Sequence, residues 1–321
     1  MSHAAIIFAG GVSSENRDDI VYSVAEALAF HQPRAEHGEV PTLTEISALL
    51  DLLDDENPDV VEAVRGRLEK LGDAALDALV KASQEDDARR RVRARSAIRS
   101  ILSRKATQSL SDYLSSGELD LETAVIMLAQ TENPHLNRDD VQGRLDVLAD
   151  RVRLQLLVAQ TPLERSQALA VVLAKEECFG GNTQDYYDPA NSYIDLVLDR
   201  KAGIPISLAV LYVLVGKRVG LDVYGVSFPR HFVTGYAEPG FVTHLDSYHN
   251  GKNLDRAACE AMLAAQNLPM NDQWFARASV VDTLRRMLGN LAHVYRQRED
   301  LTRLSRIESL LKVIEQRKRA S

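Results

Sequence analysis

Side chains capable of acid–base and ligand chemistry gather between residues 203 and 249. His231 and Asp246 lie on consecutive strand-like segments, and Ser207 follows Gly203-Ile204-Pro205 at the start of an apolar stretch. An imidazole beside a carboxylate can hold and move a proton near neutral pH. We therefore expect His231 and Asp246 to form a hydrogen-bonded pair that lines a cleft.

A metal site is the alternative use of the same residues. His244 and Asp246 are two positions apart on a predicted strand and therefore share one face. With His231 or His249 they could supply three ligands. This spacing is permissive and not specific, so the main prediction contains no metal ion and no other cofactor.

Ser207 is the candidate nucleophile if the site is catalytic. It lies two residues after Pro205, a rotation of roughly 200° on a helix of about 3.6 residues per turn. Its hydroxyl should therefore point away from the side that Pro205 faces. A serine in the first helical turn commonly bonds to the backbone, and we favour that interpretation. Cys178, near a Gly-Gly turn, is predicted to be a free structural thiol.

The elements that must position these residues are one buried helix and three short strands. Pro205 suits the first position of a helix, and the run from there to Val219 is almost wholly apolar. Strand patterns follow at 222–228, 231–237 and 241–248, and Glu238-Pro239-Gly240 joins the last two as a hairpin. The predicted fold is α+β and mostly helical, with a buried helix packed on a small antiparallel sheet.

Helices are predicted on both sides of this core. Apolar spacing of three and four residues indicates helices at 18–30, 44–53, 60–71, 74–82, 89–102, 120–130, 139–157 and 162–176. A capped helix follows at 193–200. After the strands, helices are predicted at 255–265, 279–298 and 301–317, the last two as a hairpin.

The composition excludes several classes of protein. Hydrophobic residues make up 45% and charged residues 26% of 321 residues, which is typical of a soluble globular protein. The net charge of −8 argues against general nucleic-acid binding. Two cysteines without metal-type spacing fit a reducing compartment. The short apolar N-terminus lacks the pattern of a secretory signal peptide or a membrane-spanning segment. We expect a cytoplasmic protein that binds neither nucleic acid nor a membrane.

The stretch from Cys178 to Asp246 closely resembles the SirB-type transglutaminase-like family of bacterial proteins. The resemblance rests on short identities that occur in order over about seventy positions. They are Phe179, Gly181-Asn182, Tyr187-Asp188-Pro189, Asn191-Ser192, Leu198, Gly203-Ile204-Pro205-Ile206-Ser207-Leu208, Leu211-Tyr212, Gly220-Leu221, Gly225-Val226, Phe228-Pro229, His231-Phe232 and Asp246.

The resemblance implies a papain-like fold in which Cys, His and Asp form a triad. Carried over by position, His231 is the base, Asp246 orients it, and the Cys position falls on Pro205, as it does in the family itself. Proline has neither a sulfur nor a backbone N–H, so it offers no thiolate and no amide donor to an oxyanion. The remaining triad is therefore expected to be a remnant.

The resemblance also orders the chain into four parts. We predict an N-terminal segment and linker at 1–40, and HEAT-like helices at 41–104, where Leu53 to Val64 resembles a HEAT-type repeat turn. The transglutaminase-like domain with its leading helices covers 105–254. Helices at 255–321 contain a pair that resembles a tetratricopeptide unit.

Three functions remain open at this stage. We favour a non-catalytic protein that binds a protein or peptide partner, in a cleft bordered by Asn182, Tyr187, Asn191 and Gly203. The alternative is an amide hydrolase or acyl transferase in which His231 and Asp246 act with a nucleophile other than Cys, such as Ser207. In a third, structural reading the His–Asp pair only ties strands together. Partner, substrate and oligomeric state are not specified by the sequence.

Overall fold

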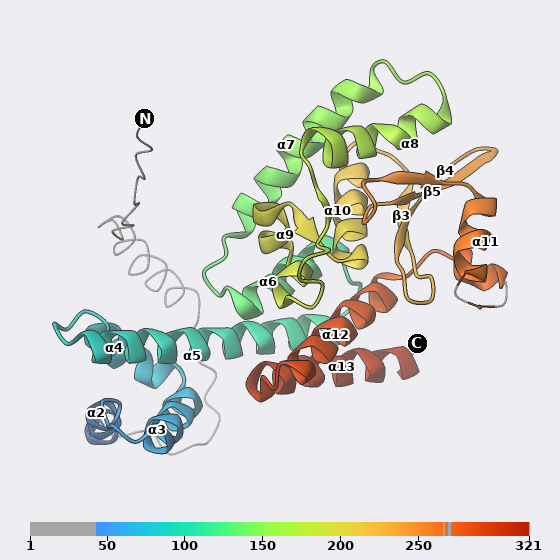
Figure 1. Cartoon of the computed structure of the whole chain (residues 1–321). Coiled ribbons are helices and arrows are strands. Elements are labelled where there is room, and N and C mark those ends of the chain that lie inside the picture. The colour runs from blue at the N-terminus through green and yellow to red at the C-terminus, as the bar shows by residue number, and fades with distance from the viewer. Residues whose placement is uncertain (1–42, 266, 269–270, 321) are drawn as a thin grey trace, which may run out of the picture. The chain divides into compact units, whose positions relative to one another are not determined.

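The computed structural model describes residues 43–265, 267–268 and 271–320 (Figure 1). The chain divides into two compact units, the first ending at Leu102 and the second beginning at Ser103. The helical pattern predicted at 18–30 lies outside the described residues. No helix in these described ranges is long and apolar enough to cross a membrane.

The first unit is a small helical array. Its helices are α2 (Leu43–Leu52), α3 (Pro58–Leu71), α4 (Asp73–Ala82) and the first part of α5 (Ala88–Ser115). The side chain of Asn57 accepts a hydrogen bond from the Asp59 N–H and so caps α3, while Pro58 takes a position where no N–H is needed. The buried side chains form one apolar cluster, which includes Leu53, Leu68, Leu76, Leu79 and Ile101.

Helix α5 is longer than the sequence pattern predicted. The expected end was Leu102, but the helix continues to Ser115. The buried hydroxyl of Thr107 donates to the Ser103 carbonyl at 2.7 Å, so the polar residues in this stretch are satisfied within the helix. The predicted domain boundary between 104 and 105 therefore falls inside a continuous helix, two residues from the division between the compact units.

The second unit contains the remaining helices. Several of its helices begin directly after a side chain that caps the first turn, such as Asp120, Thr161 and Ser279. Its helical elements are α6 (Leu121–Glu132), α7 (Arg138–Leu156), α8 (Pro162–Ala170), a π-helical turn (Val171–Glu176), a 3₁₀ turn (Pro189–Ser192), α9 (Ile194–Arg200), α10 (Pro205–Arg218), α11 (Arg256–Ala264), a 3₁₀ turn (Asp272–Phe275), α12 (Val280–Gln297) and α13 (Leu301–Ala320).

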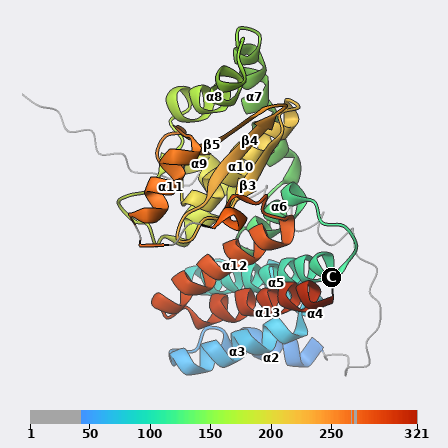
Figure 2. The same ribbon diagram turned by 90° about the vertical axis from the view of Figure 1, so that its right-hand side faces the viewer.

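A four-stranded antiparallel sheet packs against α10 (Figure 2). Its strands follow chain order as β3 (Val223–Val226), β4 (Val233–Glu238), β5 (Phe241–Asp246) and β6 (Lys252–Leu254). Pro239 and Gly240 form the predicted hairpin turn, which pairs Glu238 with Phe241. Strand β6 was not predicted. The second predicted strand began too early, because His231 lies in the loop before β4.

A separate two-residue ladder connects segments that are far apart in sequence. Strand β1 (Gly180–Gly181) pairs in parallel with β2 (Ala202–Gly203), directly before α10. The Asn182 N–H donates to the Gly203 carbonyl at 3.0 Å. This pairing closes the loop between residues 182 and 201 at its base.

The main apolar core of the second unit lies around α10, and a smaller cluster includes Phe228, Leu254 and Leu263. Every residue of α10 from Pro205 to Gly216 is buried. Leu284, Leu288 and Leu291 of α12 belong to the same cluster as the α10 side chains. The predicted boundary between 254 and 255 therefore does not separate two cores. The predicted fold class, mostly helical α+β with a buried helix on a small antiparallel sheet, is confirmed.

Candidate functional site

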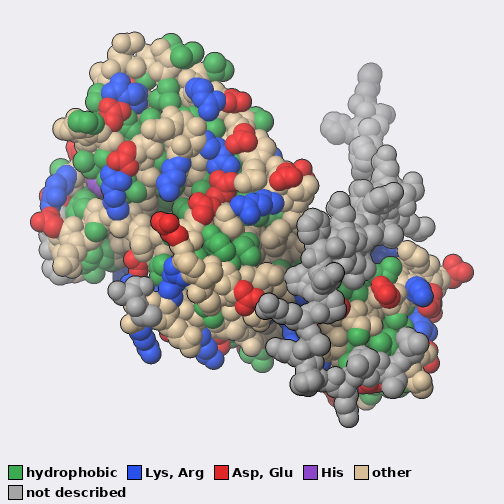
Figure 3. All heavy atoms as spheres, turned by 180° about the vertical axis from the view of Figure 1, so that it is seen from behind, with side chains coloured by type: hydrophobic (Ala, Val, Ile, Leu, Met, Phe, Trp, Pro, Cys, Tyr) green, Lys and Arg blue, Asp and Glu red, His purple; other side chains and the backbone are tan. Residues whose placement is uncertain are grey.

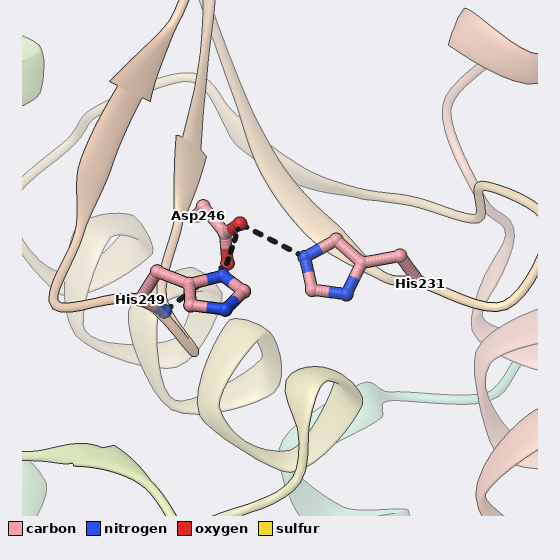
Figure 4. A group of neighbouring side chains, drawn as sticks. All are labelled: His231, Asp246 and His249. Atoms are coloured by element: carbon pink, nitrogen blue, oxygen red, sulfur yellow. Dashed lines mark hydrogen bonds and ion pairs between the residues drawn. The ribbon is translucent and has the colours of Figure 1, made fainter. Parts of the chain in front are cut away.

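Three side chains converge beside the end of β5 (Figure 4). Asp246 is the last residue of β5, His231 lies in the loop before β4, and His249 lies in the turn between β5 and β6. The Nε2 atom of His231 is 3.0 Å from Asp246 Oδ2, and Nδ1 of His249 is 2.8 Å from the same oxygen. His231 and Asp246 thus lie side by side as expected, but Nε2 has no hydrogen-bond partner of acceptable geometry among the described residues. A second imidazole, that of His249, joins the pair.

Burial sets the electrostatics of this group. His231 and Asp246 are buried, whereas the His249 side chain is 63% exposed. Burial alone would raise the pKa of the Asp246 carboxyl, but His231 and His249 outweigh burial and hold that pKa below its usual value of 3.8. Asp246 is therefore ionised at neutral pH.

A tight turn and an arginine fix the position of His231. Arg230 has a left-handed backbone (φ 59°), and the His231 N–H donates to the Phe228 carbonyl at 3.2 Å. Nη1 of Arg286, on α12, donates to the same carbonyl at 2.7 Å and to Ser227 Oγ at 2.9 Å. Burial lowers the pKa of Arg286, and no carboxylate in the described part of the chain pairs with it. Sequence reasoning missed Arg286, because only the fold brings α12 to this turn.

The start of α10 is held by Ser207. Pro205 is the first residue of the helix, as predicted. The Ser207 hydroxyl accepts from the Ile204 N–H at 3.1 Å and lies 2.6 Å from the Asn191 carbonyl, to which it can donate. Ser207 is 2% exposed. The interpretation of Ser207 as a first-turn serine bonded to the backbone is confirmed.

The predicted cleft residues shape one loop. Asn191 is fully buried, and its amide donates to the carbonyls of Asp185 and Tyr186. The Asn182 amide donates to Asn191 Oδ1 at 3.0 Å. At Gly203 a Cβ would lie 2.6 Å from Ser207 Oγ, so this position must be glycine for the backbone to approach. Asn182, Asn191 and Gly203 therefore fix the backbone of the loop. Tyr187, in contrast, is 48% exposed and can contact a ligand.

Aromatic rings extend from this loop to the histidines. The rings of Tyr186 and Tyr187 make an edge contact, and Tyr186 makes another with Tyr248, at centroid distances of 5.3 and 6.1 Å. Tyr248 in turn makes an edge contact with His249 at 5.1 Å and with His231 at 6.5 Å. Tyr248 packs where a Cβ on Gly181 would lie only 2.4 Å from its ring. We call Tyr186, Tyr187, Tyr248 and His249 the aromatic rim.

The other candidates lie apart from this contact network. His244 is buried between Phe228 and Phe275, and burial lowers its pKa. The side chains that gather around Asp246 are therefore His231 and His249, and the expected use of His244 as a ligand beside Asp246 is wrong. Cys259 is buried, and burial raises its pKa to about 12, which leaves its thiol protonated and inert. Cys178 is an exposed free thiol whose Sγ lies 3.9 Å from the Lys175 carbonyl.

The helix start, the loop with His231 and the strand that ends at Asp246 all lie in one stretch that resembles a known superfamily. Residues 139–289 match the model of the transglutaminase-like superfamily. This part of the chain is similar to the transglutaminase-like superfamily. The match begins in α7 and ends in α12, so it includes α10, the sheet and all three converging side chains.

Proteins that are similar to part of this chain occur in bacteria and in animals. A UPF0162 protein of Xylella fastidiosa is 31% identical over 138 residues, which are 43% of this chain and 49% of the relative. A UPF0162 protein of Pseudomonas aeruginosa is 24% identical over 191 residues, 59% of this chain and 69% of the relative. F-box only protein 21 of Mus musculus is 31% identical over 132 residues, 39% of this chain and 21% of the relative.

The similarity therefore covers only part of each protein. The chain spans about half the length of the Xylella relative and about a fifth of the mouse relative. No solved structure matches the chain significantly.

Proposed function

We propose that the transglutaminase-like domain binds a segment of a partner protein without forming a covalent intermediate. The observation that carries this proposal is the start of α10, where Pro205 occupies the first helical position. In the transglutaminase-like pattern this is the place of the nucleophilic Cys.

The chemistry of Pro205 supports a binding role. A thiolate at a helix N-terminus is stabilised by the helix dipole and by a neighbouring imidazolium, and proline supplies no thiolate. Proline also lacks the N–H that could donate to an oxyanion. Ser207 does not replace it, because its buried hydroxyl contacts Ile204 and Asn191 of the backbone.

The aromatic rim offers a surface for a peptide. Tyr186 and Tyr187 are 39% and 48% exposed, and their rings contact each other. Tyrosine combines a large apolar area with a hydroxyl, which suits contacts to extended protein segments.

A second exposed apolar surface lies where α7 connects to α8. Leu154, Leu157 and Val158 are 66%, 76% and 71% exposed. Hydrophobic side chains are visible at the upper end of the molecule in Figure 3, where Figure 1 places this connection. Exposed apolar groups that gather in this way are typical of protein-interaction surfaces.

The flanking helices fit the same proposal. We interpret the helices at 41–104 as HEAT-like and the pair α12–α13 as tetratricopeptide-like, both of which are helix pairs that stack and present contact surfaces. The free thiols of Cys178 and Cys259 fit a reducing compartment such as the cytoplasm.

Selection of peptides from a displayed library tests the binding function. We expect the full chain to enrich peptides whose binding is lost in Tyr187→Ala and kept in Leu301→Ala, a control at a side chain that is 73% exposed on α13. Equal binding of the selected peptides to both variants, or no enrichment at all, would contradict a peptide site at the aromatic rim.

An amide hydrolase or acyl transferase is the second candidate. The close approach of His231 to Asp246 favours it, because Asp246 Oδ2 lies 3.0 Å from Nε2 and Nδ1 is the ring nitrogen that does not face the carboxylate. That nitrogen could accept a proton from a water molecule. Amidase, esterase and transglutaminase assays that compare the protein with His231→Ala decide the matter. Turnover that His231→Ala abolishes, with an unchanged melting temperature, would establish the enzyme.

A further inference from the structure

We propose that His231, Asp246 and His249 bind one divalent transition-metal ion of the zinc class. Each residue directs one ligand atom to the group, and these three atoms lie within 4.8 Å of one another. Among the residues that the structure describes, this is the group of His, Cys, Asp and Glu side chains with the spacing of a metal site.

The distances fit two ligands that share an ion. Ligand atoms bound at about 2.1 Å to one ion lie roughly 3.0 to 3.4 Å apart when they occupy neighbouring coordination positions. Asp246 Oδ2 lies 3.0 Å from His231 Nε2 and 2.8 Å from His249 Nδ1. All three ligand atoms lie within 4.8 Å of one another, so a rotation of the exposed His249 ring would bring them around a common ion.

A buried ring nitrogen of His231 without a hydrogen-bond partner supports the metal site. Although Nε2 is only 3.0 Å from the Asp246 oxygen, this nitrogen is buried and has no hydrogen-bond partner of acceptable geometry among the described residues. An unpartnered buried ring nitrogen costs free energy. An ion bound beside Oδ2 would accept the lone pair of Nε2 and so satisfy this nitrogen.

The backbone holds the remaining ligands in place. The N–H of Gly251 donates to the Asp246 carbonyl at 2.8 Å, and the N–H of His249 donates to the same carbonyl at 3.2 Å. Asn250 and Gly251 have left-handed backbones (φ 58° and 68°), so the turn folds His249 back over Asp246. Two of the three ligands are therefore fixed by one short turn.

The donor set selects the class of metal. Two imidazoles and one carboxylate suit Zn²⁺, Co²⁺ or Fe²⁺, whereas Mg²⁺ and Ca²⁺ prefer oxygen ligands. Because His249 is 63% exposed, the ion would keep at least one position open to water or to a group of a bound partner.

Calorimetric titration of the metal-free, tag-free full chain with ZnCl₂ tests the proposal. We expect one Zn²⁺ per chain in this site. Because even the loss of a residue that only orients a ligand weakens metal binding by about 10- to 100-fold, removal of a ligand should weaken it at least a hundredfold. We expect that loss in His249→Ala, Asp246→Asn and His231→Ala.

Two control variants accompany them. His293→Ala removes an exposed histidine on α12, and Cys178→Ser removes the exposed thiol; both should keep the affinity of the unmodified chain. His249→Ala is the decisive variant because its exposed side chain is not part of the core. The visible spectrum of bound Co²⁺ provides a second readout of imidazole coordination.

Two outcomes overturn the site. One is the absence of stoichiometric Zn²⁺ binding at micromolar concentration. The other is undiminished affinity in any one of the three ligand variants. The inference is independent of the proposed peptide binding, since the titration contains neither a peptide nor a substrate.

Discussion

At the scale of single residues, the hydroxyl of Ser207 contacts three backbone groups. They are the Ile204 N–H, the Ile204 carbonyl and the Asn191 carbonyl, all within 3.1 Å. This explains how a hydroxyl two residues beyond Pro205 is retained in a buried helix without acting on a substrate.

Ser207→Ala should therefore destabilise the fold and leave binding intact. The change removes the partners of buried backbone groups, for which about 1–3 kcal/mol is the expected loss in the free energy of unfolding. Chemical denaturation measures it. Ser309→Ala is the control, because Ser309 bonds to the Arg306 carbonyl on an exposed face of α13. A stable Ser207→Ala protein that loses a measured turnover would instead identify Ser207 as a nucleophile.

Gly181 is the residue on which the position of Tyr248 depends. A methyl group at Gly181 would lie 2.4 Å from the Tyr248 ring, so Gly181→Ala should displace the ring and cost about 1–3 kcal/mol. Gly143→Ala, in the exposed interior of α7 with no atom within 4 Å, should stabilise by about 0.5–1 kcal/mol. Thermal unfolding of both variants checks the pair. Equal effects would show that Tyr248 does not pack on Gly181 in solution.

At the scale of elements, helical periodicity was a better guide than strand patterns. The pattern predicted α6, α7, α10 and α12 to within a few residues, because each carries a continuous apolar stripe or is buried all round. Strand β6 has only three residues and no alternation that the sequence could reveal. Helix α5 exceeded its predicted length because Ser and Thr hydroxyls bonded within the helix replace the apolar pattern.

The candidate site was predictable only in part. His231 and Asp246 could be paired from their order on neighbouring segments. His249 entered only as one option for a metal ligand, because its place over Asp246 depends on the left-handed Asn250 and Gly251, which no residue pattern specifies. Arg286 could not be found from sequence, since it lies more than fifty residues from the turn that it holds.

The contact of α8 with β4 gives a pH-dependent stability. Arg165 Nε donates to Glu238 Oε1 at 2.6 Å, and this hydrogen bond, with that from Tyr236, lowers the pKa of Glu238 from 4.5 to about 2. A lowered pKa means that the stabilisation is complete above about pH 4.5 and is lost as the pH falls towards 2.

Glu238→Gln should therefore lower the melting temperature at pH 7, and the difference from the unmodified chain should shrink between pH 4.5 and pH 2. Thermal melts across this range measure it. Glu308→Gln, which alters an exposed pair with Arg296, should change the melting temperature little at pH 7. A difference for Glu238→Gln that stays constant down to pH 2 would contradict the assignment.

At the scale of the whole molecule, the two compact units have separate apolar clusters. The cluster of the first unit runs from Ile46 to Leu102; the second unit has a main cluster from Leu110 to Ile314 and a smaller one from Val226 to Leu263. Each unit therefore buries its own core, although α5 is continuous between them.

Leu68→Ala should destabilise only the first unit. Leu68 is fully buried in α3, and truncation of such a side chain costs about 2–5 kcal/mol. Hydrogen exchange measured by mass spectrometry should show faster exchange in peptides from 46–102 and unchanged exchange in peptides from α10 and α12. Leu211→Ala in α10 should give the converse. Faster exchange throughout the chain in Leu68→Ala would show that the two units unfold together.

The two-residue ladder of β1 and β2 has a consequence for how such proteins can diverge. Its backbone hydrogen bonds fix both ends of the loop that carries Tyr186 and Tyr187, and the Gly181 N–H also donates to the Tyr248 carbonyl beside His249. Substitutions at the tip of the loop can therefore exchange one recognition surface for another while the histidines keep their places. Because both ends of the loop are fixed, new binding specificities can be selected or designed in the loop while the core stays unchanged.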